Sequence, residues 1–401
     1  MKTRPSRGAA GGFTVVELMA SMALALIVCG ALFTLLDAAR RTAGSNAEVG
    51  ELQQRLRASL HLVANELVNA GAGPDRTPLA GPLGFVFPAV APYRRGQIGD
   101  DAQAGVTFRP DVLSLAYVAS SPAQAEVAGT VDLGGRLRVT VRPNCGALAP
   151  VAVCGFVEGM RVVLFEPSGA HDFLTVEDVA GADVELSYRG PLASTYAAGT
   201  AVVAHVAAHT FARRPDPATG IPQLTHYDGF LTERPAVDHV VGLWFEYFGE
   251  ADPPRLGPGA EPGVTRGPWT TYGPAPPPIG VDDASTAWSE GENCAFTVVD
   301  GRHEPRLAVL GPPGTLVPLD AEVLGDGPWC PDADAVRRYD ADLLRVRQVR
   351  IRVRAEAAPR SMRASAGAVF TRGGVASAGM DQAPDQEAVL DIVPRNLGTR
   401  R

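Results

Sequence analysis

A run of apolar residues close to the N-terminus constrains this chain more than any other feature. Residues 13–36 read FTVVELMASMALALIVCGALFTLL and are almost wholly apolar. As an α-helix this segment would be about 36 Å long, which is enough to cross the hydrocarbon core of a bilayer. A basic segment, MKTRPSRGAAGG, precedes it at residues 1–12, and Arg40 and Arg41 follow it. The sequence therefore predicts one membrane-spanning helix near the N-terminus.

The small residues stand on the opposite side of this run from those of a secretory signal. A secretory signal has its small-residue cleavage site after the apolar region, whereas Gly11 and Gly12 come before it. Cleavage after Gly12 would leave the hydrophobic helix on the mature protein. A plain signal anchor accounts for the basic leader and the apolar run, but it does not account for Glu17.

Glu17 is a carboxylate inside the apolar run, at the fifth position when Phe13 is counted as the first. A charge in the hydrocarbon core is costly to insert, and such residues usually have a partner. Cleavage after Gly12 would create a partner, because it frees the amino group of Phe13. We therefore expect Glu17 of one subunit to pair with the Phe13 amine of a neighbour in an assembly.

The run GFTVVEL at residues 12–18 resembles the cleavage and methylation motif of type IV prepilins. The resemblance implies that a prepilin peptidase cuts between Gly12 and Phe13 and methylates the Phe13 amine. It also implies a filament of packed N-terminal helices that is built on an inner-membrane assembly platform. Major pilins commonly carry a proline near the middle of this helix, and residues 13–70 contain none. That departure favours a minor subunit.

After residue 36 the pattern changes to that of an amphipathic helix, which we assign to residues 37–73. The run GAGP at residues 71–74 ends it. We therefore predict one long helix over about 13–70, with a weak point at Gly44 or Gly50, whose second half packs on a globular domain. Its inward face is formed by residues at steps of three and four, namely Leu52, Leu56, Leu60, Val63 and Leu67.

Residues 74–401 are predicted to form a large β-rich globular domain. The chain has 44 Gly and 34 Pro, which favours many short strands joined by turns. A Pro/Gly-rich insertion covers about 250–290. The fold class is therefore α+β and pilin-like, with a long hydrophobic and amphipathic helix packed on an antiparallel β-rich domain. The predicted strands are 112–119, 137–141, 160–165, 173–176, 184–188, 201–211, 240–247, 349–354 and 389–393.

Short motifs in the body resemble one branch of the family. In order they are DVLSL at 111–115, VGLWFEY at 241–247, the arginine-rich VRIRVR at 349–354 and IVPRNL at 392–397. This order resembles PilW-type minor pilins and, more distantly, the larger minor pseudopilins of type II secretion. Arginine alternates with Val or Ile along 349–354, and we expect the arginines to form a solvent-exposed face.

Four of the five cysteines lie in the polar body, and Cys29 lies in the apolar run, where it acts as a small apolar residue. If the body is exported, the economical disulfide pairs are Cys145–Cys154 and Cys294–Cys330, although three connectivities remain open. No CxxC spacing typical of a metal site is present.

The formal net charge is -8, and this acidic balance argues against nucleic-acid binding. We expect the partners to be other pilin subunits, the prepilin peptidase, the assembly platform and membrane lipid. His205 and His209 have the spacing of a helical metal pair, but their neighbours favour a strand, so we predict no metal site. We expect solvated loops at two acidic stretches, Asp332, Asp334, Asp340 and Asp342, and Asp282, Asp283, Glu290 and Glu292.

The sequence contains no GxSxG, no Cys-His signature and no phosphate-binding loop, so we predict neither enzymatic activity nor a cofactor. The function we expect is that of a minor type IV pilin that helps initiate or cap pilus assembly. It would cross the inner membrane once with its globular domain in the periplasm, and would then join the pilus at the cell surface. The alternatives are a minor pseudopilin of a type II secretion system and a membrane-anchored periplasmic enzyme or binding protein. The last alternative predicts no dependence on Gly12 or Glu17.

Overall fold

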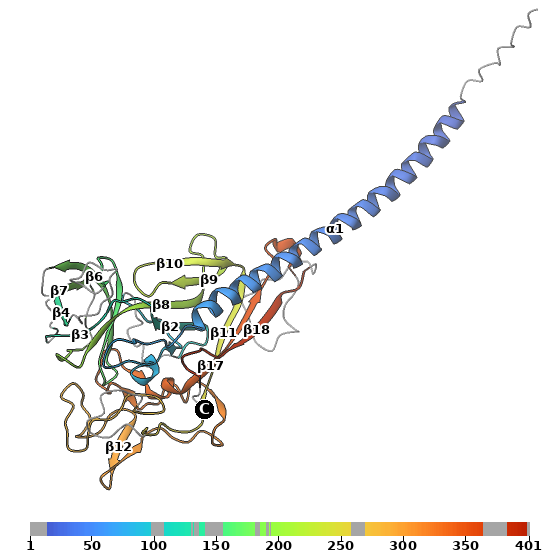
Figure 1. Ribbon diagram of the computed structural model, residues 1–401. Helices are drawn as coiled ribbons and strands as arrows, with labels where there is room; N and C mark the ends of the chain where they lie inside the picture. The colour runs from blue at the N-terminus through green and yellow to red at the C-terminus, as the bar shows by residue number, and fades with distance from the viewer. Residues whose placement is uncertain are drawn as a thin grey trace, which may run out of the picture.

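A long helix leads into a large antiparallel β-rich body, which confirms the α+β class (Figure 1). The structure is a computed structural model of the 401-residue chain. It describes residues 14–97, 108–129, 131, 136–140, 155–180, 185–189, 192, 194–257, 269–363 and 383–398.

Helix α1 spans Val15–Leu67 without interruption, a length of 53 residues. At 1.5 Å per residue this is about 80 Å. The predicted weak point at Gly44 or Gly50 is absent, because a single glycine costs only about 1 kcal/mol in a helix. The cap residue Val68 donates its backbone N–H to Ala64 and Glu66. The chain then turns at Gly71, whose φ of 82° lies in the left-handed region that favours glycine.

The first sheet of the body has the order β1-β2-β8-β9-β10, and all its pairs are antiparallel. The outer strands β9 and β10 were not predicted, because they lack an apolar alternation. Strand β10 lies at an edge and its ladder is interrupted by a bulge beside Pro235, a residue that edge strands tolerate. The strands are β1 (Val90–Ala91), β2 (Val112–Val118), β8 (Val202–Pro215), β9 (Pro222–Tyr227) and β10 (Glu233–Asp238).

The first part of β8 also belongs to a small barrel. Its strands pair in the order β8-β3-β4-β7-β6-β5, and β5 pairs back with β8, so the ring closes. A separate apolar cluster fills the barrel and includes Val127, Leu164 and Leu174. The other strands are β3 (Gln124–Val127), β4 (Arg136–Thr140), β5 (Arg161–Phe165), β6 (His171–Ala180) and β7 (Glu185–Arg189).

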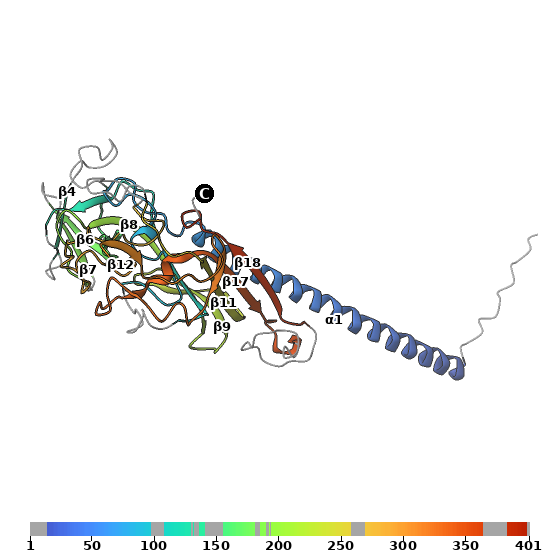
Figure 2. The ribbon, with the colours of Figure 1, turned by 90° about the horizontal axis from the view of Figure 1, so that it is seen from below.

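The second sheet has the order β14-β11-β17-β18 and lies beside helix α1. Figure 2 shows β17 and β18 next to the helix where it enters the body. The four strands are β11 (Val240–Glu250), β14 (Leu316–Leu319), β17 (Val346–Ala355) and β18 (Gln386–Ile392). Two short ladders complete the strands of the described residues: β12 (Phe296–Val299) with β13 (Arg302–Pro305), and β15 (Trp329–Cys330) with β16 (Tyr339–Asp340). Three short 3-10 helices are η1 (Leu83–Phe85), η2 (Ala341–Arg345) and η3 (Arg360–Met362).

One large core joins the helix to both sheets. Tyr247 of β11 is buried and donates its hydroxyl to the carbonyl oxygen of Val112 at 3.1 Å, which links the second sheet to the first. The C-terminal segment secures the end of the helix. Arg395 donates its backbone N–H to the carbonyl oxygen of Val68 at 3.1 Å. Asn396 donates its side-chain N–H to the backbone carbonyl oxygen of Asn69 at 3.2 Å.

The predicted insertion lies between β11 and β12. Its described residues, 251–257 and 269–295, form neither helix nor long strand. It is not a loosely attached loop, because Tyr272 is buried and donates its hydroxyl to the carbonyl of Asp252 at 2.8 Å. The described part of the insertion therefore packs as part of the body.

Candidate functional site

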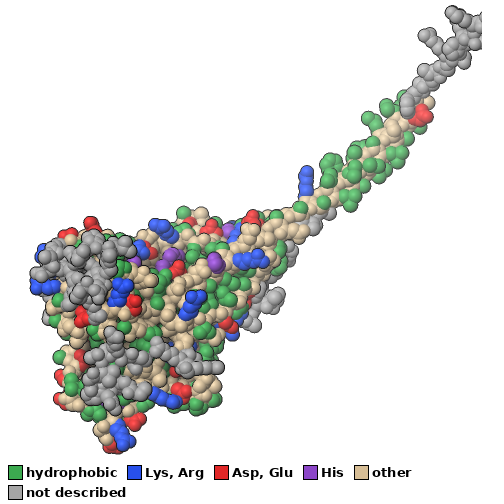
Figure 3. Space-filling view, viewed as in Figure 1, with side chains coloured by type: hydrophobic (Ala, Val, Ile, Leu, Met, Phe, Trp, Pro, Cys, Tyr) green, Lys and Arg blue, Asp and Glu red, His purple; other side chains and the backbone are tan. Residues whose placement is uncertain are grey.

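The outer half of α1 projects from the body and is covered with apolar side chains (Figure 3). The segment Val15–Asp37 is long and apolar enough to cross a membrane, and none of it is buried in the body. A signal sequence near the N-terminus would meet the same criterion. An exposed apolar surface of this size in a folded protein marks an interaction with lipid or with other chains. We therefore take this half of α1 as the candidate functional site.

Glu17 has a partner within its own chain. Its Oε2 accepts hydrogen bonds from the backbone N–H of Thr14 at 3.1 Å and from the Thr14 hydroxyl at 3.0 Å, and its own N–H lies 3.3 Å from Thr14 Oγ1. This is a capping box, which satisfies helix N–H groups that otherwise lack acceptors. The signal for it, Thr-x-x-Glu before an apolar run, was present in the sequence and was overlooked.

The predicted cleavage point lies next to this cap. Gly12 and Phe13 fall outside the described residues, so the pairing of Glu17 with a neighbour's Phe13 amine stays a prediction. The capping box offers Glu17 a second role, as a helix cap. The two roles differ in one respect, because capping needs only an acceptor side chain whereas pairing with an amine needs the charge.

The inner half of α1 docks on the body through the predicted apolar face. Leu52, Leu56, Val63 and Leu67 are buried, and Leu60 is partly buried against the same core. Burying a side chain of this size is worth roughly 1.5–3 kcal/mol. Because α1 is continuous, this docking sets the direction in which the apolar outer half leaves the body.

Polar contacts add to the docking at two points. Glu48, on the helix, is almost buried and accepts hydrogen bonds from Arg55 at 3.1 Å and from the backbone N–H of Ala358 at 2.8 Å. Further along, Glu66 accepts hydrogen bonds from the Tyr117 hydroxyl at 2.8 Å and from His209 Nε2 at 3.2 Å. The side chains of the helix therefore bond to both sheets or to the loops beside them.

The second of these points forms a small cluster. Nδ1 of His209 lies 2.8 Å from Nε2 of His226, so His209 bridges β9 to the helix. The hydrogen bond from His209 is the main cause that lowers the pKa of Glu66 to about 2. Burial lowers the pKa of His226. His205 lies elsewhere on β8, where its Nδ1 is 3.2 Å from Ser121 Oγ, so the two histidines of the sequence pair do not meet.

No group of three or more His, Cys, Asp or Glu side chains within the described residues is placed to hold a metal ion. The prediction of a solvated loop is wrong for most of the first acidic stretch, because Asp332, Asp340 and Asp342 are buried. Asp340 accepts hydrogen bonds from the backbone N–H groups of Gly327 at 2.7 Å and of Asp342 at 2.8 Å. Burial raises the pKa of Asp340 to about 7.

In the second acidic stretch, Asp282 and Glu290 are exposed, as predicted, and Asp283 is half-buried. Glu292 forms an ion pair with Arg306 at 2.5 Å and accepts the Thr297 hydroxyl at 2.6 Å. Glu292 therefore holds the local chain together.

The predicted solvent face of arginines on β17 is wrong in part. Arg350 binds Asp391 of β18 through two hydrogen bonds of 2.7 and 3.0 Å, and Arg352 binds Glu387 at 2.6 Å. Arg354 is 2% exposed, and its guanidinium lies 5.4 Å from the Trp244 ring centroid. The arginines face acidic residues of neighbouring strands, because β18, predicted as a strand at 389–393, pairs with β17, and periodicity does not reveal which strands are neighbours.

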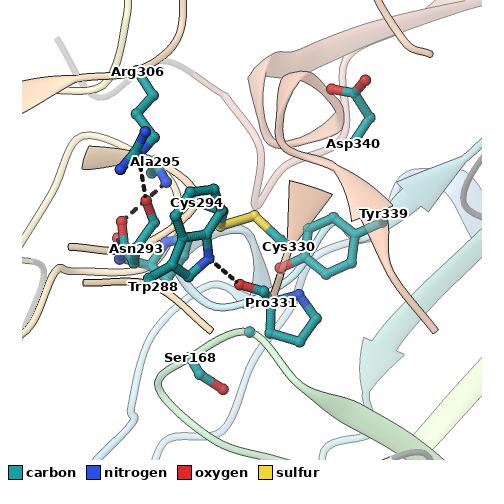
Figure 4. The surroundings of a disulfide bond; sticks show 12 residues. Ser168, Trp288, Asn293, Cys294, Ala295, Arg306, Cys330, Pro331, Tyr339 and Asp340 are labelled. Carbon is teal, nitrogen blue, oxygen red and sulfur yellow. Dashed lines mark hydrogen bonds between the residues drawn. A yellow bond between two sulfur atoms is a disulfide. The ribbon is translucent and has the colours of Figure 1, made fainter. Parts of the chain in front are cut away.

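A disulfide joins Cys294 to Cys330, which are 36 residues apart in the sequence (Figure 4). Trp288 lies beside it and donates its indole N–H to the carbonyl of Pro331 at 2.6 Å. The disulfide between Cys294 and Cys330 is one of the two cysteine pairs favoured by the sequence. The other two cysteines, Cys145 and Cys154, lie outside the described residues, and Cys29 is exposed on α1.

One buried arginine had no signal in the sequence. Arg345 is fully buried, and its Nε binds the carboxylate of Asp342. Its Nη1 donates to the carbonyls of the three successive residues 250–252 at 3.1, 3.3 and 3.2 Å, and its Nη2 donates to that of Ala308. A single guanidinium therefore ties the start of the insertion to Ala308, which follows β13.

Comparison with known proteins adds no further constraint, because no protein-family model, curated protein or solved structure matches this chain.

Proposed function

We propose that this protein is a subunit of a type IV pilus, anchored in the inner membrane through α1 and then packed into a filament by the same helix. The proposal includes cleavage by a prepilin peptidase between Gly12 and Phe13 and methylation of the new Phe13 amine. The globular body would lie in the periplasm and then on the outside of the pilus. The size of the body and the absence of proline from α1 favour a minor subunit that initiates or caps assembly.

One observation carries the proposal: α1 runs without a break from an exposed apolar half into the core of the body. A simple membrane anchor needs no such continuity, since a flexible linker would serve it. A filament subunit does need it, because the position of the body must follow from the packing of the helix. The prepilin-like run at residues 12–18 supports the same conclusion.

The second candidate is a minor pseudopilin of a type II secretion system, which would use the same processing and the same helix. The order of the motifs in the body, which ends with Arg395 and Asn396 close to the end of α1, is compatible with both. Deletion of the chain separates them. Loss of surface pili supports the first candidate, and loss of protein secretion with pili intact supports the second.

Processing is tested by the N-terminus of the mature protein. The chain is expressed with and without the prepilin peptidase, and its N-terminal peptide is identified by mass spectrometry. We expect a mature chain that begins with methylated Phe13, and an unprocessed chain for Gly12→Val. Gly30→Val, in the same helix but away from the cut, is the matched control and should be processed normally. An intact leader on the wild-type chain in the presence of the peptidase would reject the proposal.

Assembly is tested by two variants that separate the roles of Glu17. Glu17→Gln keeps a side chain that can complete the capping box but loses the charge. Thr14→Ala keeps the charge but removes the cap, at a cost of about 1 kcal/mol to the helix. If Glu17 pairs with the Phe13 amine of a neighbour, Glu17→Gln should be inserted and cleaved yet excluded from filaments, whereas Thr14→Ala should assemble.

The measurement is the amount of each variant in sheared filaments relative to the inner membrane. Glu51→Gln is the control, because Glu51 lies on the same helix, is exposed and belongs to the docked half. Normal incorporation of Glu17→Gln together with loss of Thr14→Ala would show that the residue acts as a cap, and the charge-pairing mechanism would then be abandoned.

A further inference from the structure

A cavity of about 860 Å³ lies between the barrel and the insertion. This volume falls in the range of about 300–1,000 Å³ that is typical of small-molecule sites. Glu166 and Ser168, in the turn between β5 and β6, form one wall, and Ser168 belongs to the surroundings of the disulfide (Figure 4). Trp269 and the run APPPI at residues 275–279 form much of the other wall.

The proline wall is held in place by His303 and Asn293, which also line the cavity. Nε2 of His303 lies 3.1 Å from the carbonyl oxygen of Pro277 and 3.0 Å from that of Gly291, so it must carry a hydrogen that it donates to them. Asn293 donates its amide to the carbonyl of Pro274 at 3.0 Å. Asn293 is followed directly by the disulfide-bonded Cys294. Because this wall is fixed without a ligand, binding would require little ordering of the protein.

The charged side chains of the cavity have one sign. Glu166, Asp282 and Asp283 line it, and none of the described lining residues is Lys or Arg. Glu166 is 3% exposed, and its Oε1 accepts the Ser168 hydroxyl at 2.9 Å. Burial is the main cause that raises the pKa of Glu166. Because these three acidic side chains lie in one concave site, the potential inside it is negative, which attracts cations and repels anions.

We propose that this cavity binds a small ligand that carries a positive charge on an apolar body, such as a protonated amine or amidinium attached to an aromatic ring or an alkyl group. The apolar body would lie against the proline wall and Leu79. The cation would lie near Glu166 and Asp283. Phosphates and carboxylic acids would be rejected by the same carboxylates. This binding site is independent of the assembly role of α1.

Two probes of nearly the same shape and opposite charge test the proposal. Benzamidine and benzoate are titrated into the full chain in lipid nanodiscs and followed by isothermal titration calorimetry, with empty nanodiscs as the blank. We expect benzamidine to bind with a Kd at least tenfold lower than that of benzoate. Glu166→Gln and Asp283→Asn should each weaken benzamidine binding about fivefold or more. Ala284→Trp, which adds a large side chain to an exposed lining position, should abolish it.

Glu158→Gln is the matched control, because Glu158 is an exposed carboxylate that precedes β5, whereas Glu166 follows it. It should leave the Kd for benzamidine unchanged. Near-ultraviolet circular dichroism verifies that each variant keeps the packing of the body. Equal binding of the two probes, no benzamidine binding at millimolar concentration, or an equal effect of Glu158→Gln and the cavity variants would overturn the proposal. None of these results bears on filament assembly.

Discussion

Replacing Arg345 by Leu is expected to destabilise the body strongly. The side chain is fully buried, binds the Asp342 carboxylate and donates to the carbonyls of residues 250–252 and Ala308. Removing one partner of a buried ion pair leaves the other charge without compensation, which costs about 3–5 kcal/mol. A whole domain has a free energy of unfolding of only about 5–15 kcal/mol. We therefore expect Arg345→Leu to remove a large share of the stability and to loosen the contact between the start of the insertion and Ala308.

The assay is urea unfolding of the full chain in nanodiscs, followed by tryptophan fluorescence. Arg350→Leu is the control, because Arg350 is also paired with a carboxylate but lies near the surface of β17. Its loss should change the free energy of unfolding far less, since exposed pairs contribute little. The double variant Arg345→Leu/Asp342→Leu should recover part of the loss, because it removes the unpaired charge as well.

The pH dependence provides a second check. Burial raises the pKa of Asp342 to about 6 even with Arg345 beside it. Without the arginine this pKa rises further, so Asp342 becomes neutral at a higher pH in the folded variant. A carboxyl with a raised pKa destabilises the folded state above that pKa, and this destabilisation declines as the pH falls from the folded-state pKa towards the unfolded-state pKa. The loss of unfolding free energy caused by Arg345→Leu should therefore be smaller at pH 6 than at pH 8. A loss no larger than that of Arg350→Leu, or one that does not change with pH, would refute this reasoning.

Three further outcomes follow from the same structure. Leu67→Ala, at the docked end of α1, should lower the free energy of unfolding by about 2–5 kcal/mol, whereas Leu36→Ala, on the exposed half, should leave unfolding of the body unchanged. The pKa of Glu66 is lowered from 4.5 to about 2, so its charge stabilises the fold above about pH 4.5 and this contribution is lost as the pH falls towards 2. Acid titration should therefore be less destabilising for Glu66→Gln than for the wild type. Replacing Cys294 and Cys330 by Ser should cost about 3–4 kcal/mol by the loop-closure model, measured by urea unfolding, and an unchanged midpoint would contradict a closed disulfide.

The helix and the central strands were predictable because their signals are local. The apolar run and the recurrence of Leu52, Leu56, Val63 and Leu67 each describe one face of one helix, and the pattern needs no knowledge of the partner. Strands β11 and β17 were found in the same way, because buried strands are rich in β-branched and aromatic residues. Edge strand β10 was not predicted, because five of its six residues are exposed and it therefore shows no apolar pattern.

Polar residues were predicted less well, because their environment depends on residues far away in the sequence. Arg354 and Asp340 have charged side chains and were expected in solvent, but β18 and Gly327 supply their surroundings. The Thr14–Glu17 cap differs, because its two residues are three positions apart and form a local signature from which it could have been predicted, although it was not.

The sequence by itself determined that the chain has a long apolar helix with a carboxylate near its start, and that this helix continues into an amphipathic segment ahead of a β-rich body. Composition and periodicity are sufficient to predict these features, because each pattern depends only on residues that are close together within one element. Only the tertiary structure decided that β8 closes a barrel, that Arg345 ties the start of the insertion to Ala308, and that three carboxylates share a cavity with a proline wall. These features join segments separated by tens to hundreds of residues, and such contacts follow from the packing of whole elements and not from any local pattern.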